Sequence, residues 1–471
     1  MNTYTKTLVV DVFNKILLAL SIFISISLIG VLLILMPGFS TFVFDFEFFL
    51  YVFLVLVPLV LIGTFGTKKI IKSEKYKKLK LFAFWTIISF IFVCTVVLAF
   101  YESGDYVAFL NVWGTEYSQL SLKDAFYKIV DISNYTPVYN YFLIFIYKIG
   151  AKGVLWIKYL TFIFSIGLGF VVEKIITYIR KDEFNFLRFI FFMIVPPVLI
   201  EYAAWGQCDA IYVLFSLLAL YFALKKKSKL SFMNIGLAFA FKLQFLFIVP
   251  ILFILLIIKD ENGEHYLKWK DIWIAPLMYA INLIPIFTGR NVLDLLLVYV
   301  NQVGFDNRIS GDCANICFIY FNAGVLYGSN IYSILSYFHI FITFVVMAIL
   351  LFIVLKYNKQ KNLSFDELIF FGMVFSFIMV FFMPKMIDRF YFISMCLALI
   401  YYFVKIDKYS RNIALGLVFS QFLAMYPSIS YGVGRIIFIY IALIINFILF
   451  VVMFVKVFNL RKNSDQIKAE G

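Results

Sequence analysis

Charged residues are scarce in this sequence, and no long polar segment separates its apolar runs. Of the 471 residues, 14% are charged and 64% are hydrophobic, and the mean hydropathy is +0.97. A soluble domain carries roughly a quarter charged residues, so this composition excludes a chain that folds mainly in water. We therefore expect an all-α polytopic membrane protein with a single membrane domain.

Cysteine and histidine are also few, which limits the metal and disulfide chemistry of the chain. The five cysteines are scattered, and Cys313 and Cys317 stand four residues apart, a helical spacing rather than a zinc-binding pattern. Only two histidines, His265 and His339, could assist them. We expect no disulfide framework, no structural metal and no cofactor. Whether outer acidic residues bind Mg²⁺ or Mn²⁺ together with a lipid phosphate stays open.

The abundant residues are aromatic and basic. The 60 phenylalanines and 31 tyrosines suit lipid-facing and interfacial surfaces. A net charge of +14 would suggest nucleic acid in a soluble protein, but here the lysines cluster in short loops between apolar runs. The positive-inside rule explains that placement, so we expect no nucleic-acid partner. One loop holds seven of these lysines: Lys68, Lys69, Lys72, Lys75, Lys77, Lys78 and Lys80.

Apolar runs long enough to cross a bilayer follow one another along the chain. A crossing helix needs about 20 apolar residues. The first run is too long for a signal-peptide core and lacks a small-residue cleavage site, so we expect it to remain as a helix. We predict about 14 transmembrane helices with both termini in the cytoplasm. They are 16–36, 47–66, 81–100, 154–179, 186–201, 208–224, 230–244, 245–258, 271–289, 331–356, 366–383, 389–404, 412–427 and 433–457.

Lysine and arginine are distributed unequally over the two sides of this topology. The cytoplasmic segments hold 30 of the 41 Lys and Arg residues, the outer segments hold 9, and Lys158 and Lys242 lie within helices. A further crossing at 135–150 would place the later lysine loops outside. We therefore expect 135–150 to be an interfacial or re-entrant helix in the first outer loop, and 291–300 is a second candidate of this kind.

Four polar clusters stand at the outer ends of the predicted helices. Each has an ordinary structural explanation: a capped helix end, a polar turn, a snorkelling lysine or a loop ion pair. Acidic residues that adjoin apolar helices are nevertheless costly unless they face a polar cavity. The clusters are Glu102 and Asp105 in YESGDYVAFLNVW; Glu201, Trp205, Gln207 and Asp209 in EYAAWGQCDAIY; Lys242 and Gln244 in AFAFKLQFLFIVP; and Lys385, Asp388 and Arg389 in MPKMIDRFYF.

Together the clusters place two aspartates and three cations on one membrane face, a combination that suits sugar transfer from a lipid phosphate. Cations bind phosphate at a membrane surface. A departing phosphate is a weak base, so the reaction needs little general acid. It does need one carboxylate to deprotonate the acceptor hydroxyl and fixed cations to stabilise the departing charge.

The motifs SGDY, TPVYNYF, WGQCDAIY, FKLQFLFIVP and MPKMIDRFY follow one another in this chain. In these motifs and their order it resembles the lipid-phosphate-sugar-dependent glycosyltransferases of the GT-C class, in particular bacterial relatives of the GPI mannosyltransferase II family. The likeness spans roughly 81–405, and WGQCD together with FKLQ is its most specific part. One position departs from the family: Ile387 stands before Asp388–Arg389, where relatives often have histidine.

The resemblance implies a GT-C-like helix bundle with a membrane-embedded pocket for a polyprenyl-phosphate sugar. It makes 81–405 the catalytic core, flanked by an N-terminal hairpin with its basic loop (1–80) and a C-terminal hairpin with its tail (406–471). The aspartate that acts as catalytic base in the family corresponds to Asp105. We expect catalytic roles for Asp105 and Asp209, phosphate binding by Lys242, Lys385 and Arg389, and a substrate pocket formed by Glu102, Trp205, Gln207, Gln244 and Asp388.

The expected function is inverting transfer of mannose or another hexose to a cell-surface glycan, glycolipid or protein, on the extracytoplasmic face of the cell membrane. Two alternatives stay open. A polysaccharide polymerase or ligase also uses outer arginines and lipid-linked donors, but more usually has a larger outer loop. A lipid-linked glycan transporter should show broken or charged helices near mid-membrane in two related halves. This sequence shows no internal repeat, and its polar residues crowd one face.

Overall fold

Helices form nearly all of the regular structure in the part of the chain that can be described. The computed structural model describes residues 45–71, 77–300, 308–323, 329–430, 432 and 434–470, and these contain isolated β-bridges but no named strand. Seven helices are long and apolar enough to cross a membrane, or eight if one bent pair is a single span. The protein is thus an all-α multi-pass membrane protein. The predicted crossing 16–36 lies outside the described residues.

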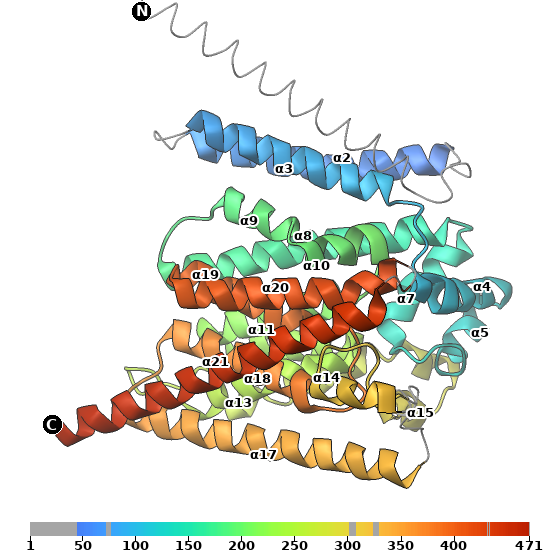
Figure 1. The fold of residues 1–471 in the computed structure, drawn as a ribbon. Helices are drawn as coiled ribbons and strands as arrows, with labels where there is room; N and C mark the ends of the chain where they lie inside the picture. The colour runs from blue at the N-terminus through green and yellow to red at the C-terminus, as the bar shows by residue number, and fades with distance from the viewer. Residues whose placement is uncertain are drawn as a thin grey trace, which may run out of the picture.

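The long helices run side by side, with α2 and α3 along one edge and α17 along the opposite edge (Figure 1). In a bilayer core no water is present to pair with backbone groups, so a helix that satisfies its own backbone is the stable form for these apolar runs. Phe53 on α2 and Phe341 on α17 are exposed, as expected of lipid-facing surfaces. The seven helices are α2 (Phe46–Ile71), α3 (Lys77–Val97), α8 (Gly153–Arg180), α17 (Asn330–Gln360), α18 (Phe365–Phe382), α20 (Lys408–Ile429) and α21 (Arg435–Glu470).

Several predicted crossings form short or bent helices. The run at 186–201 becomes α9 (Phe186–Met193) and then α10 (Pro196–Leu199) with η3 (Ile200–Trp205), bent by 67°. Pro196 and Pro197 stand at the bend, where proline lacks the N–H that an unbroken helix would use. Four other runs form helices of up to 16 residues: α11 (Asp209–Leu224), α12 (Ser228–Phe241), η4 with α13 (Leu243–Ile248 and Val249–Ile257) and α19 (Phe392–Lys405).

The predicted crossing at 271–289 is wrong as a single helix. The structure has η5 (Trp269–Asp271), α14 (Ile274–Ile281), η6 (Ile284–Thr288) and α15 (Val292–Leu296) here. The chain breaks after α14, where the Tyr141 hydroxyl donates to the carbonyl of Asn282 at 2.5 Å and accepts the N–H of Ile284 at 3.1 Å. A side chain from another helix thereby satisfies backbone groups that a continuous helix would have paired internally.

Short helices gather beyond one end of the bundle, on the right in Figure 1. The predicted helix at 135–150 is α7, which begins with Pro137 at its first turn, a position that suits proline. Its depth relative to a bilayer stays a prediction. This group comprises η2 (Tyr106–Leu110), α4 (Asn111–Gln119), α5 (Leu122–Tyr127), α6 (Ile129–Ile132) and α7 (Pro137–Lys148).

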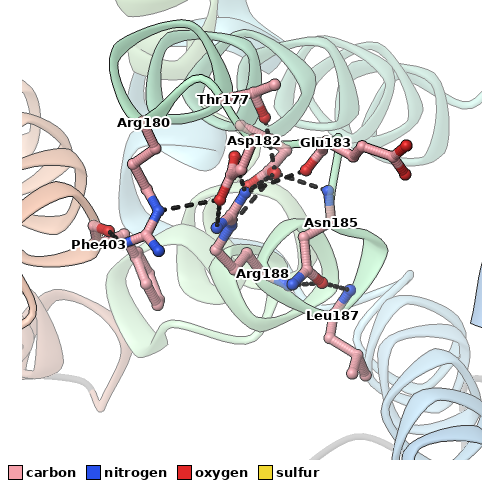
Figure 2. A network of polar contacts seen from close by, with 9 residues as sticks. Thr177, Arg180, Asp182, Glu183, Asn185, Leu187, Arg188 and Phe403 are labelled. Carbon is pink, nitrogen blue, oxygen red and sulfur yellow. Dashed lines mark hydrogen bonds and ion pairs between the residues drawn. The ribbon is translucent and has the colours of Figure 1, made fainter. Parts of the chain in front are cut away.

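The opposite end of the bundle is held by charged side chains, some of which are drawn in Figure 2. Between α8 and α9, Arg188 bonds to Glu173 at 2.7 Å and to Asp182 at 2.9 Å. Burial works against the charged form of Asp182, but hydrogen bonds from Arg188 and Arg180 outweigh it and lower the pKa of Asp182. Arg180 also donates to the carbonyl of Phe403 at 2.9 Å, which joins the ends of α8 and α19. We call this end of the bundle, where Arg180 and Arg188 lie, the basic end.

Candidate active site

Asp105 lies in the turn that follows α3, at the end of the bundle opposite the basic end. Lys158 of α8 is buried, and its ammonium donates to the carbonyls of Leu98 and Tyr101 just past the end of α3. A cation at this position also interacts favourably with the negative, C-terminal end of the α3 dipole. Ser103 accepts the N–H of Tyr106 at 3.2 Å and donates to the carbonyl of Trp205 at 3.0 Å. This pair of bonds brings the first and second sequence clusters together.

A glycine turn shapes the second cluster. Gly206 follows η3 with a φ of +71°, a left-handed conformation that glycine adopts without steric cost. The turn places Gln207 beside α8, where Thr161 donates to its carbonyl at 3.1 Å. It also starts α11 at Asp209, whose N–H donates at 3.0 Å to the fully buried carboxylate of Glu201.

Two cations from later in the chain complete the group around Asp209. Lys242 lies at the end of α12, and its nitrogen is 2.7 Å from Oδ1 of Asp209. Arg389 belongs to the connection between α18 and α19, and its Nε lies 2.9 Å from Oδ2 of Asp209. The second contact is an ion pair without hydrogen-bond geometry. The Arg389 guanidinium also stacks over the Trp205 ring at 5.0 Å.

The carboxylate of Asp105 is engaged at one of its two oxygens. Oδ2 accepts from Trp205 Nε1 at 3.1 Å and from Gln207 Nε2 at 2.9 Å, and Arg389 Nη1 lies 3.0 Å from it. Within the described part of the chain, Oδ1 has no hydrogen-bond partner. The Asp105 side chain is 26% exposed, whereas that of Asp209 is fully buried. Asp105 is therefore the carboxylate of this group that a substrate can reach.

The buried charges of the site are arranged as mutual partners, as burial requires. Burial disfavours a charged guanidinium, but Asp105 and Asp209 outweigh that effect and hold the pKa of Arg389 above its usual value. Asp388 lies beside Arg389, with Oδ1 3.6 Å from Nη1. Burial raises the pKa of Asp388 to about 7, against the opposing influence of Arg389 and of a hydrogen bond from Ser428.

Three of the residues expected in the site lie apart from this group. Lys385 adopts a φ of +61° and lies 5.9 Å from the centre of the Tyr332 ring. Gln244 lies in η4, and its buried side-chain oxygen has no partner in the described structure. Glu102 is exposed and acts electrostatically on Lys158. The other seven form the cluster that we call the acid–cation site: Asp105, Trp205, Gln207, Asp209, Lys242, Asp388 and Arg389.

The structure adds residues that the sequence did not single out as site residues. Tyr135, the residue before the TPVYNYF motif, donates to Gln207 Oε1 at 3.3 Å, and Thr136, the first residue of that motif, donates to the carbonyl of Phe241 next to Lys242 at 3.1 Å. For Thr136, its place in that motif was a signal. Ser428 and Gln421 of α20 bond to Asp388, and nothing in the local sequence pointed to that contact.

No metal centre is evident in the described residues, since they hold no group of three or more His, Cys, Asp and Glu side chains that could bind an ion. The carboxylates of Asp105 and Asp209 are instead occupied by cations of the chain itself. A groove of about 480 Å³ lies elsewhere, near the basic end between α20 and α21. It is lined by Tyr409, Val451, Val452, Val455, Lys456, Asn459 and Leu460.

Comparisons of this chain with protein-family models, with curated proteins and with solved structures found no match. A functional assignment therefore depends on the motifs of the sequence and on the geometry of the acid–cation site.

Proposed function

We propose that this protein is a GT-C-type membrane glycosyltransferase that moves a monosaccharide, mannose or another hexose, from a polyprenyl-phosphate sugar to a glycan, glycolipid or protein at the cell surface. The observation that supports this most is the state of Asp105. Two hydrogen-bond donors and the Arg389 guanidinium hold its Oδ2, while its Oδ1 has no partner among the described residues, and two cations lie within the same group. A general base beside a phosphate site needs this combination.

In the proposed reaction, Oδ1 of Asp105 takes the proton of the acceptor hydroxyl. The hydroxyl oxygen then attacks the anomeric carbon of the sugar on the side opposite the phosphate. The bond between that carbon and the phosphate oxygen breaks, and its electron pair leaves with the polyprenyl phosphate. A single displacement inverts the configuration at the anomeric carbon.

Arg389 and Lys242 are the proposed phosphate-binding groups. Both lie against Asp209, which keeps two buried cations close together before the donor arrives. Fixed cations stabilise the charge that develops on the departing phosphate without having to reorganise during the reaction. Lys385 lies beside Tyr332 and outside the acid–cation site, so this proposal gives phosphate binding to Lys242 and Arg389 first.

The proposed active site faces the extracytoplasmic side of the cell membrane, and both termini are proposed to be cytoplasmic. The acid–cation site and the basic end lie at opposite ends of the long helices. Asp105 lies eight residues beyond Val97, the last residue of α3, while Lys77 begins that helix; Lys158 stands near the start of α8, while Arg180 ends it. Cytoplasmic loops carry the excess of lysine and arginine in membrane proteins, which supports this orientation.

Purified protein would be incubated with a panel of polyprenyl-phosphate monosaccharides and with cell-envelope glycans and glycolipids as acceptors. Consumption of one donor, absent in Asp105→Asn, supports the proposal. Movement of a lipid-linked glycan across vesicles by a wild-type protein that consumes no donor would instead favour a transporter. Joining of preformed lipid-linked glycans would favour a polymerase or ligase.

A further inference from the structure

Asp388 is held by bonds from two other parts of the chain. From α20, Gln421 donates to its backbone carbonyl at 2.8 Å and Ser428 donates to its Oδ2 at 2.5 Å. From the preceding loop, Gly311 accepts the backbone N–H of Asp388 at 3.2 Å. Gln421 is fully buried and Asp388 is 6% exposed, so water does not replace these partners easily.

These bonds hold the residue next to Arg389. Arg389 follows Asp388 directly in the irregular connection between α18 and α19, where no extended helix holds its backbone. Its guanidinium has to reach Asp105 and Asp209 at the same time, at 3.0 Å and 2.9 Å. A connection that was free to shift would not keep both contacts, because each depends on the position of the same short segment.

Helix α20 also supports the ring on which Arg389 stacks. Met425 packs with Trp205 and Ile200 in a small buried cluster, about one turn from both Gln421 and Ser428. Helix α20 thus contacts two residues that lie against the guanidinium, Trp205 and Asp388. Asp388 and Trp205 thus share one supporting helix.

Helix α21 braces the same loop from further out. Arg435 bonds to both oxygens of Asp312, at 2.7 Å and 2.8 Å, next to the Gly311 carbonyl that holds Asp388. Asn446 donates to the carbonyl of Ala314 at 2.8 Å. Gly311 in turn donates to the carbonyl of Met386 at 2.7 Å. The hairpin of α20 and α21 therefore contacts the Arg389 connection directly and through residues 308–315.

We propose that Ser428 and Gln421 are positioning residues that set the Arg389 guanidinium for the phosphate of the donor. The C-terminal hairpin is then a working part of the site, although it lies outside 81–405. This inference rests on the proposed function, because it takes Arg389 to be a phosphate-binding group. Neither residue touches the substrate; both act through Asp388.

The test uses the full-length protein in nanodiscs and measures the Kd for polyprenyl phosphate and the melting temperature of each ligand-free variant. Ser428→Ala and Gln421→Met remove the two donors with little change in volume. Each should raise the Kd roughly tenfold, the scale of one hydrogen bond to a charged or buried group. Ser428→Thr keeps the hydroxyl and should restore the wild-type Kd.

Ser420→Ala is the matched control, because Ser420 is buried on the same helix and donates only within it, to the carbonyl of Leu417 at 3.3 Å. Its Kd should equal that of the wild type. Arg389→Ala separates this inference from the proposed function. If Arg389→Ala loses binding while Ser428→Ala and Gln421→Met keep it and only melt earlier, the two residues are structural and the inference is overturned. If the wild type itself does not bind polyprenyl phosphate, both the inference and the phosphate site fail.

Discussion

The carboxylate of Asp209 lies 2.7 Å from the ammonium nitrogen of Lys242, and both side chains are almost completely buried. A buried ion pair adds little net stability, but removal of one partner leaves an uncompensated charge and is strongly destabilising. Because Arg389 still lies 2.9 Å from Asp209, Lys242→Met leaves that charge only partly compensated and should cost at most roughly 3 kcal/mol of unfolding free energy. The double variant Lys242→Met with Asp209→Asn should recover most of it. Thermal unfolding in one detergent compares the variants, and a single variant as stable as the wild type would contradict this account.

Loss of the Asp105 carboxylate should affect turnover far more than donor binding. Asparagine keeps an acceptor oxygen for Trp205 and Gln207 but cannot take a proton at neutral pH. Asp105→Asn should therefore lower kcat by roughly 10²-fold or more, while donor affinity stays near the wild-type value because Lys242 and Arg389 remain. Glu116→Gln, an exposed change on α4, is the control and should leave kcat unchanged.

The corresponding change at Asp209 should affect donor binding more than turnover. Asp209 is fully buried between Lys242 and Arg389, so its neutralisation disturbs the cations more than the base. Asp209→Asn should raise the KM for the donor more than it lowers kcat. Steady-state kinetics on both variants decide the matter: normal turnover in Asp105→Asn together with collapse in Asp209→Asn would exchange the two roles.

Donor binding should become tighter as the pH falls through about 7, because burial raises the pKa of Asp388 to about 7. Above that pH the ionised Asp388 competes with the donor phosphate for the Arg389 guanidinium. Below it Asp388 is neutral, and the guanidinium interacts with the phosphate more strongly. Kd for a polyprenyl-phosphate monosaccharide, a phosphodiester whose charge does not change in this range, measured from pH 6 to pH 8.5 checks this. Asp388→Asn keeps an acceptor for Ser428 and should remove the dependence, holding the low-pH affinity throughout. A wild-type Kd that does not change with pH would disprove this assignment.

Gly206→Ala should destabilise the protein and disturb the second cluster. The φ of +71° is unfavourable for alanine, and a Cβ there would lie 3.2 Å from the Lys158 side chain. A non-glycine residue in such a conformation costs roughly 1–3 kcal/mol. A lower melting temperature checks the prediction, and Gly104→Ala is the control, since a Cβ at Gly104 would meet nothing within 4 Å.

The orientation of the bundle can be tested by cysteine labelling from outside the cell. A cysteine at Ser118, exposed on α4 near the acid–cation site, should react with a membrane-impermeant reagent. Cysteines at the exposed positions Lys229 and Lys359, at the basic end, should react only after the membrane is opened. Labelling of Lys229→Cys in intact cells would reverse the proposed orientation.

Apolar length predicted the long helices well, because a run that is too apolar for water has few structures open to it besides a helix. Helices α2, α3, α8, α17, α18, α20 and α21 all lie over predicted runs. Hydropathy could not reveal the break after α14, since the backbone there is satisfied by Tyr141, a residue far away in the sequence. The count of about 14 crossings stays a prediction, with seven or eight candidates in the described residues.

Seven of the ten residues expected in the site from the sequence lie together, as acids and cations beside apolar helices require, while their roles in a reaction stay a prediction. Which acidic side chain pairs with which cation could not be predicted from the sequence. Lys385 and Arg389 stand four residues apart, yet only Arg389 joins the site, since the connection between α18 and α19 is not a continuous helix and turns at Lys385. The contacts of Ser428 and Gln421 with Asp388 likewise depend on how α20 packs.

The distance along the chain between Asp105 and Arg389 has a consequence for how the protein is made. Synthesis proceeds from the N-terminus, so Asp105 and Asp209 enter the bilayer long before the arginine that pairs with both. Lys242 arrives first and neutralises Asp209 in the interval. Until Arg389 is made, Asp105 stands beside apolar helices without its cationic partner, a costly state. The charges of the site are therefore balanced only once the connection between α18 and α19 has been made.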